Sequence, residues 1–183
     1  YENAGTVEFI MDAHKNFFFL EVNTRLQVEH PITEEITGLD LVEQQIRIAF
    51  GETLTFTQDS VKLHNHAIEV RIYAEDPNTF YPSPGTITNI SLPGGEDIRH
   101  ELAVRTGSVV TPFYDPMIAK LIVKGQTRSE AIKKMSEALE QYTVEGIKTN
   151  ILTLKRVVDH PEYLSGNTTT NFIDNHLKNT KVH

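Results

Sequence analysis

The sequence predicts an α+β fold in which helices cover an antiparallel sheet, and three observations support this prediction. Short β-prone runs alternate with turn signals, a later segment repeats its apolar residues at helical spacing, and two β-prone runs near the start flank a polar loop. A length of 183 residues suffices for one ordinary domain, or for a small domain plus part of another.

The first elements that we expect are a hairpin and two short helices. Residues 6–11 and 17–23 are rich in β-formers and flank a polar loop. Pro31 suits the first turn of a helix that Gly38 ends. Asp40 and Glu43 have capping-box spacing for a second helix that stops at Gly51.

Residues 52–65 are polar and irregular, so we place a domain boundary there, between residues 1–61 and residues 62–183. Beyond it, β-prone runs separated by Pro- and Gly-rich turns predict an antiparallel sheet from residues 67–73, 85–92, 97–102 and 117–123.

A longer helix should cover this sheet. Thr127 and Glu130 have capping-box spacing, and one apolar face follows, formed by Ala131, Met135, Ala138, Leu139 and Tyr142. Two further helical segments, residues 151–158 and 171–177, are separated by a break at His160-Pro161. The polar residues 178–183 are expected to fray.

Composition excludes several classes of function. The formal net charge of -8 argues against a nucleic acid or an anionic membrane as the main partner. Without cysteine there are no disulfides or thiolate metal sites, and no apolar run is long enough to span a bilayer, so we expect a cytoplasmic protein. The chain begins without an initiator Met or a signal peptide, which we interpret as a fragment of a longer protein.

The hairpin places two carboxylates opposite each other. With a four-residue loop, residues 13–16, Asp12 pairs with Phe17 and Glu8 faces Glu21. Asn23 shares the face of Glu21, about 6 to 7 Å further along. Opposed like charges cost up to about 1 kcal/mol, so this arrangement needs a compensating partner.

A divalent cation would be such a partner. Carboxylate and amide oxygens suit a hard ion, Mg²⁺ or Mn²⁺, and Mg²⁺ held by one or two carboxylates usually also binds substrate phosphates. The alternative is that both glutamates lie on a solvated face and never meet.

Arg25, Gln27 and Glu29 continue the parity of Asn23 along the chain. A guanidinium beside a carboxylate suits the binding and deprotonation of an oxyacid such as bicarbonate, although a surface salt bridge is the simpler alternative. We interpret His30, directly before Pro31, as structural rather than catalytic.

Several strings together resemble the biotin carboxylases, which are ATP-grasp enzymes, along nearly the whole chain. These strings are Gly5-Thr6-Val7-Glu8-Phe9, Glu21-Val22-Asn23-Thr24-Arg25-Leu26-Gln27-Val28-Glu29-His30-Pro31, Glu69-Val70-Arg71-Ile72-Tyr73-Ala74-Glu75-Asp76-Pro77, Tyr114-Asp115-Pro116-Met117 and Gly146-Ile147-Lys148-Thr149-Asn150. The resemblance implies that residues 1–61 are the C-terminal part of an ATP-grasp domain and residues 62–183 a biotin carboxylase C-terminal domain.

For the nucleotide, the resemblance implies that Glu8 and Glu21 bind two metal ions, Mg²⁺ or Mn²⁺, that bridge the phosphates of the substrate ATP. Asn23 would assist the second ion. Ile10 and Ile147 would be apolar walls of the adenine pocket.

For the reaction, the resemblance implies that Arg25, Gln27 and the backbone of Val28 hold bicarbonate and that Glu29 deprotonates it. Carboxyphosphate would form and break down to CO₂ and phosphate. Arg71, which would also contact bicarbonate, would stabilise the enolate-like oxygen of biotin.

The implied partners are a biotin carboxyl carrier protein or domain, a carboxyltransferase and a second copy of the chain. Glu96-Asp97 depart from the aromatic residue that a dimeric bacterial member carries there, whereas Arg99 matches. The family's glycine-rich lid and ATP-binding lysines precede the matched region, so the resemblance implies that this chain is inactive alone. The final carboxyl acceptor, acetyl-CoA, pyruvate or another, is not encoded here.

Two alternatives stay open. Another ATP-grasp ligase, such as a carbamoyl-phosphate synthetase, shares the Glu-x-Asn-x-Arg pattern of residues 21–25. The chain could also be a non-catalytic dimerisation or docking module, in which case changes at Glu21 and Arg25 would disturb assembly and leave turnover intact.

Overall fold

The computed structural model describes residues 1–177, so the fraying expected for residues 178–183 lies outside the described residues. The chain divides into two compact units, Tyr1–His64 (unit 1) and Asn65–His183 (unit 2). The boundary between them falls within the polar sequence segment 52–65. The fold is mixed, with helices and antiparallel strands, as the sequence predicts.

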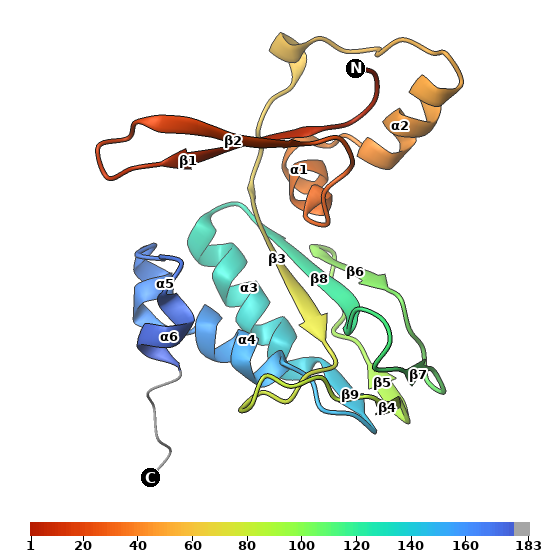
Figure 1. The fold of residues 1–183 in the computed structure, drawn as a ribbon, viewed down its shortest axis with the longest axis vertical. Helices are drawn as coiled ribbons and strands as arrows, with labels where there is room; N and C mark the ends of the chain where they lie inside the picture. Colours follow the sequence, from red (N-terminus) through yellow and green to blue (C-terminus); the bar gives the residue numbers. More distant parts are fainter. Residues whose placement is uncertain (178–183) are drawn as a thin grey trace. The chain divides into compact units, whose positions relative to one another are not determined.

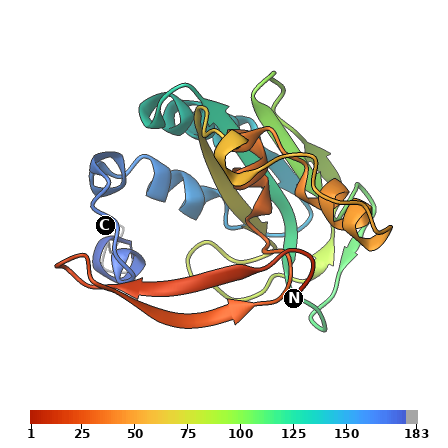
Figure 2. The same ribbon diagram turned by 90° about the horizontal axis from the view of Figure 1, so that it is seen from above.

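Unit 1 consists of a hairpin followed by short helices (Figure 1). Its elements are β1 (Thr6–Met11), β2 (Phe17–Asn23), α1 (His30–Thr37), α2 (Leu41–Ala49) and the 3-10 helix η1 (Gln58–Ser60). Figure 2 shows β1 and β2 side by side along a twisted two-stranded ribbon. Gly38 ends α1 in the left-handed region at φ 74°, and the Asp40 side chain caps α2 by accepting from Glu43 N at 2.7 Å, both as expected.

The hairpin register corrects one prediction and confirms another. Met11, not Asp12, pairs with Phe17, so the loop is one residue longer than expected. Asp12 belongs to this loop, where its carboxylate accepts from His14 N at 2.8 Å and Asn16 N at 3.0 Å. A β-bulge at Leu20 then restores the predicted pairing of Glu8 with Glu21. The longer loop and the bulge each shift the strand register by one residue, in opposite directions, so Glu8 still lies opposite Glu21.

Unit 2 is built on a three-stranded antiparallel sheet of order β3-β8-β6, with two small ribbons, β4-β7 and β5-β9. Its strands are β3 (His66–Tyr73), β4 (Gly85–Thr86), β5 (Asn89–Ser91), β6 (Ile98–Leu102), β7 (Val109–Val110), β8 (Met117–Gly125) and β9 (Thr143–Glu145). Its helices are α3 (Arg128–Gln141), α4 (Ile151–Val158), α5 (Pro161–Ser165) and α6 (Phe172–His176).

One face of this sheet packs against α3 and α4, as Figure 1 shows. Alternation along β3 buries Ile68, Val70 and Ile72 and leaves Glu69 and Arg71 on the other face. The apolar face predicted for α3 is buried, and it supplies the core residues Ala131, Met135, Ala138 and Leu139, with Tyr142 as C-cap. Within the described part of the chain, no helix has the length and apolar character needed to cross a bilayer.

The remaining differences from prediction concern short elements. Residues 85–92 do not form one strand, because Ile87 and Thr88 interrupt it and bond to different partners, Ser108 and Glu145. The strands β7 and β9 and the helix α5 were not expected. With two to five residues each, they are too short to show periodicity.

Candidate functional site

The predicted convergence of Glu8, Glu21 and Asn23 is present. The Asn23 Nδ2 amide donates to Glu8 Oε1 at 2.7 Å and to Glu21 Oε1 at 3.2 Å. Strand pairing sets Glu8 opposite Glu21, and Asn23 pairs with Thr6 at the end of the same ribbon. Three oxygen-bearing side chains therefore meet at one end of the hairpin.

This group suits a divalent cation by its chemistry. Two carboxylates and an amide supply oxygen ligands without sulfur or imidazole, which is the donor set of Mg²⁺ and Mn²⁺. Glu8, Glu21 and Asn23 are therefore the residues of unit 1 that could hold such an ion.

Gln27 connects this group to Arg25. Its Nε2 donates to Glu8 Oε1 at 2.9 Å, while its Oε1 accepts from Arg25 Nη1 at 2.7 Å. Arg25 Nη2 also approaches Asn23 Oδ1 at 3.5 Å. The guanidinium is thereby held next to the carboxylates, with the amide of Gln27 between them.

An open pocket of about 540 Å³ in unit 1 gathers the predicted anion-binding residues. Its lining includes Glu8, Arg25, Gln27, Glu29 and His30. A cation, an amide and a carboxylate thus border one volume that could accept a small oxyanion.

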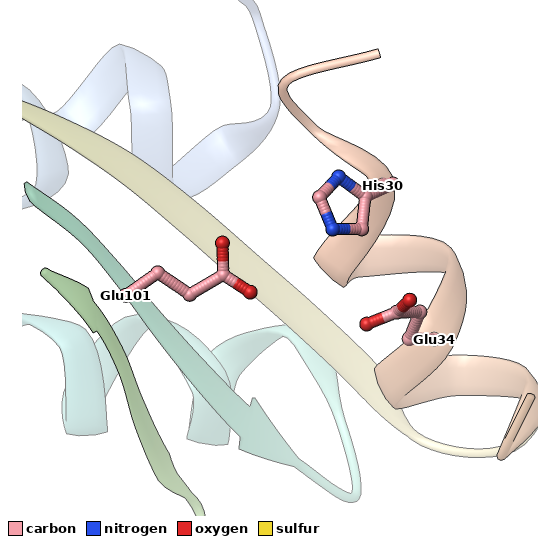
Figure 3. Close-up of side chains that lie close together, drawn as sticks. All are labelled: His30, Glu34 and Glu101. Carbon is pink, nitrogen blue, oxygen red and sulfur yellow. The ribbon is translucent and has the colours of Figure 1, made fainter. Parts of the chain in front are cut away.

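The turn that carries Gln27 and Glu29 is closed by His30. The backbone N–H of His30 donates to the Gln27 carbonyl oxygen at 3.2 Å, and the imidazole Nδ1 lies 2.8 Å from the same oxygen. Figure 3 shows His30 and Glu34 one turn apart on α1. Glu34 is buried, and its Oε1 accepts from Leu41 N at 2.9 Å, which ties α1 to the first turn of α2.

Arg71 lies on β3 of unit 2, at the position expected on the polar face of the strand. The backbone that follows Arg71 is held by the buried Asn150. Asn150 Nδ2 donates to the Arg71 carbonyl at 3.1 Å, and Asn150 Oδ1 accepts from Tyr73 N at 2.9 Å. These bonds lie beside the register shift between Ile72 and Tyr73.

Sequence reasoning did not identify Asn150 as a support of Arg71. Asn150 is the last residue of the string 146–150, one of the strings that resemble the biotin carboxylases. That resemblance was the one sequence feature that pointed to Asn150. Its bonding partners, 77 and 79 positions earlier in the chain, emerge only in the fold.

Charged residues surround Arg71 on its own sheet. Across the strands, Arg71 pairs with Lys120 and Lys120 with Glu101 of β6, which is labelled in Figure 3. Glu101 forms ion pairs with Lys120 and Arg99. Burial raises the pKa of the Glu101 carboxyl, but the hydrogen bonds from Lys120 and Arg99 outweigh it and hold that pKa below its usual value.

Glu69 precedes Arg71 by two positions on the same face of β3. Among the described residues its two carboxylate oxygens are buried without a hydrogen-bond partner. Burial raises the pKa of Glu69 to about 7, against a smaller opposing effect of the Lys120 charge. This group is thus poised to titrate near neutral pH.

The two residues predicted to wall an adenine pocket have different surroundings. Ile10 lies on β1 with 57% of its surface exposed. Ile147 is partly buried against the core of unit 2, and its Cγ2 lies 2.9 Å from the position that a Cβ on Gly85 would take.

Two family models match the chain. The model described as "Biotin carboxylase C-terminal domain" matches residues 69–175. The model described as "Carbamoyl-phosphate synthase L chain, ATP binding domain" matches residues 1–57.

Curated proteins of high identity also match. Biotin carboxylase 2 of Bacillus subtilis is 64% identical over 177 residues, which are 97% of this chain and 40% of that protein. The mitochondrial methylcrotonoyl-CoA carboxylase subunit alpha of Mus musculus is 51% identical over 97% of this chain and 25% of its own length. The chain therefore spans less than half of these relatives.

Solved structures show the same fold. The biotin carboxylase domain of Hydrogenobacter thermophilus 2-oxoglutarate carboxylase, a dimer in complex with MgADP, ADP and bicarbonate, superposes with a TM-score of 0.94 at 46% identity. The match covers 96% of this chain and 39% of that one. Kluyveromyces lactis urea amidolyase matches with a TM-score of 0.90 at 44% identity, over 95% of this chain and 10% of that one.

Proposed function

Since this chain belongs to the biotin carboxylase C-terminal domain family, we propose that it is part of an ATP-dependent biotin carboxylase. Such an enzyme transfers the carboxyl group of bicarbonate to biotin on a carrier protein, through carboxyphosphate. This is the first half-reaction of acetyl-CoA carboxylase and related carboxylases, and in the acetyl-CoA case it serves fatty acid biosynthesis.

The observation that carries the proposal is the position of Gln27. Its side-chain amide bonds to both groups: Nε2 donates to Glu8 Oε1 at 2.9 Å, and Oε1 accepts from Arg25 Nη1 at 2.7 Å. A site for a phosphate-bridging cation and a site for a small oxyanion are thus adjacent in one unit, as a reaction between ATP and bicarbonate requires.

Glu8, Glu21 and Asn23 would hold two divalent ions, Mg²⁺ or Mn²⁺. Bound there, the ions supply charge neutralisation for the phosphates of ATP. The amide of Asn23 contacts both carboxylates and can present its oxygen in place of its nitrogen by rotating.

Arg25, Gln27 and the Val28 backbone would bind bicarbonate, and Glu29 at the same pocket would accept its proton. The bicarbonate oxygen then attacks the γ-phosphorus of ATP, the bond to ADP breaks, and carboxyphosphate forms. Arg25 favours this step because its fixed positive charge faces the anion in the pocket.

Carboxyphosphate breaks down to CO₂ and phosphate, and the phosphate takes the proton from the biotin ureido nitrogen. That nitrogen then forms the new bond to the carbon of CO₂. Arg71 would contact bicarbonate and stabilise the enolate-like oxygen of biotin during this step. Asn150 supports the role by holding the backbone at Arg71 and Tyr73.

The proposed partners are a biotin carboxyl carrier protein or domain, a carboxyltransferase and a second copy of the chain. Asp97, which departs from the dimeric bacterial pattern, binds Lys134 of its own chain at 2.5 Å. The adenine contacts of Ile10 and Ile147 and the cytoplasmic location stay predictions.

The test is bicarbonate-dependent ATP hydrolysis by the full-length gene product, with stimulation by free biotin. Glu21→Gln should lower kcat at least about 100-fold, because a preorganised charge at the transferring phosphate is lost. Arg25→Ala should raise the KM for bicarbonate. Glu137→Gln, on the exposed side of α3, is the matched control and should leave both constants unchanged.

Intact turnover with disturbed assembly in the Glu21 and Arg25 variants would instead identify a docking module.

One observation favours a second candidate. Residues 1–57 match the ATP-binding domain of the carbamoyl-phosphate synthase large chain. Synthesis of carbamoyl phosphate from ammonia or glutamine by the full-length gene product, without stimulation by biotin, would establish that function in place of the first.

A further inference from the structure

Asn23 holds the two opposed carboxylates of the hairpin with its side-chain nitrogen. Its Nδ2 group donates to Glu8 Oε1 at 2.7 Å and to Glu21 Oε1 at 3.2 Å. Ionised carboxylates can only accept, so the amide is oriented with its nitrogen toward them. Glu8 and Glu21 are paired across the ribbon, where like charges repel, and the shared donor offsets this repulsion.

The oxygen of the same amide faces Arg25. Asn23 Oδ1 accepts from Arg25 Nη2 at 3.5 Å, a long and weak hydrogen bond. Arg25 Nη1 donates to Leu26 O at 3.2 Å and to Gln27 Oε1 at 2.7 Å, which engages both of its N–H groups. The donors of Arg25 that remain for an anion are therefore those of Nε and Nη2, and Asn23 draws on Nη2.

The Nη2 group is important for anion binding because Arg25 lines the pocket of unit 1. An oxyanion such as bicarbonate binds a guanidinium best through two parallel N–H groups on neighbouring nitrogens. With Nη1 engaged, Nε and Nη2 form the edge of Arg25 that can still bind in this way. A protein acceptor on Nη2 therefore competes with the anion.

A divalent cation would require the opposite orientation of the Asn23 amide. A cation is bound by oxygen and repelled by N–H groups, so Asn23 can be a ligand only when Oδ1 faces the two glutamates. The change is a half-turn about the Cβ–Cγ bond, a torsion with broad preferences in Asn. After the half-turn the amide nitrogen faces Arg25, so donor opposes donor, and Nη2 no longer has Asn23 as its acceptor.

We propose that Asn23 couples metal binding to bicarbonate binding through this half-turn. With its nitrogen on the carboxylates, Asn23 keeps Nη2 of Arg25 engaged. With its oxygen on a bound Mg²⁺ or Mn²⁺ ion, it releases Nη2 to the anion. The inference rests on the proposed function and adds to it a link between the two sites. Asn23 is a positioning residue for bicarbonate, because it acts on the anion only through Arg25.

The experiment measures bicarbonate affinity without turnover. Thermal unfolding of the full-length gene product is followed at increasing bicarbonate concentration, with EDTA or with Mg²⁺, and the rise in unfolding temperature gives the Kd for bicarbonate. Sodium chloride at equal concentration corrects for ionic strength. In the wild-type protein we expect Mg²⁺ to lower this Kd at least about threefold, the scale of one exposed polar contact.

Two substitutions at Asn23 should change the Kd measured with EDTA in opposite directions. Asn23→Ala removes the acceptor from Nη2, so it should bind bicarbonate about threefold more tightly than the wild-type protein. Asn23→Asp adds a charge that holds the guanidinium more firmly, so its Kd should rise. Asn175→Ala, the same change as the first at an exposed position of α6, should match the wild-type protein. Asn23→Leu, of similar size to Asn and without an acceptor, replaces Asn23→Ala if the latter does not fold.

A bicarbonate Kd with EDTA that is unchanged or weaker in Asn23→Ala would overturn the inference, because Asn23 would then not compete for Arg25. Equal Kd values with EDTA and with Mg²⁺ in the wild-type protein would also overturn it, as would an effect of bicarbonate no larger than that of chloride. None of these results removes the proposed function, which stands if the wild-type protein shows bicarbonate-dependent ATP hydrolysis. Absence of that hydrolysis would overturn the proposed function, and the inference with it.

Discussion

Gln27 Nε2 donates to Glu8 Oε1 at 2.9 Å across 19 positions of the sequence. Glu8 Oε1 also accepts from Asn23, so two amides converge on one carboxylate oxygen. Through the opposite end of its side chain, Gln27 accepts from Arg25. The metal-binding and anion-binding residues proposed here are thus one hydrogen-bonded group.

Because of this hydrogen bond, we expect the effects of substitutions at Gln27 and Glu8 on kcat/KM to be coupled. In the full-length gene product, Gln27→Leu and Glu8→Gln should not be additive in kcat/KM for bicarbonate, with a coupling of about 1 kcal/mol, because Gln27→Leu removes the contact that Glu8→Gln weakens by replacing a carboxylate acceptor with a neutral amide oxygen. The double-mutant cycle measures this coupling. Gln126→Leu, exposed between β8 and α3, should combine additively with Glu8→Gln, and additivity of the first pair would contradict the linkage.

Asn150→Ala should destabilise unit 2 by about 2 kcal/mol. The substitution leaves the carbonyl of Arg71 and the N–H of Tyr73 without their partner at a buried position. Thermal unfolding of the full-length gene product checks this value. Asn175→Ala, at an exposed position of α6, should change the unfolding temperature little, and equal effects of the two changes would count against the role of Asn150.

Glu69 predicts a pH dependence of stability. Its folded pKa of about 7 lies above the ordinary value of 4.5, so the folded state binds more protons than the unfolded state between these pH values. Stability therefore falls as pH rises through this range, and the loss is complete above pH 7. Replacement by Gln, which stays neutral, removes the loss.

We accordingly expect Glu69→Gln to equal the wild-type protein in unfolding temperature near pH 4.5 and to exceed it at pH 8. The gain should be about 1–2 kcal/mol after allowance for solvent screening. Glu137→Gln, at an exposed position, should show no such pH-dependent gain. A stabilisation by Glu69→Gln that is the same at both pH values would refute the pKa argument.

Gly146→Ala should destabilise unit 2 by at least about 2 kcal/mol. A Cβ at this position would lie 2.1 Å from the Thr86 carbonyl oxygen, and its φ of 94° disfavours any side chain. That oxygen and the Thr88 N, which would lie 2.9 Å from the new Cβ, are both backbone atoms, so they cannot move aside cheaply. Gly94→Ala, where no atom lies within 4 Å of the new Cβ, is the control for thermal unfolding.

The sequence by itself determined the longer regular elements, and it predicted the pairing of Glu8 with Glu21, which holds because the longer loop and the bulge at Leu20 compensate each other. Period-two alternation in β3, capping residues at Asp40 and Thr127, and the apolar face of α3 are local properties, and each was sufficient to locate its element. Arg25 and Glu29, to which the resemblance to a known family assigns bicarbonate binding and deprotonation, both line the pocket of unit 1.

Only the tertiary structure decided how these residues are held. The longer hairpin loop, the bulge at Leu20 and the division of residues 85–92 depend on which backbone groups find partners elsewhere. The bonds of Asn150 to β3 and of Gln27 to β1 join residues far apart in sequence. Periodicity and capping report on neighbours within a few residues, so they determine elements and faces, whereas contacts between distant segments emerge only when the chain has folded.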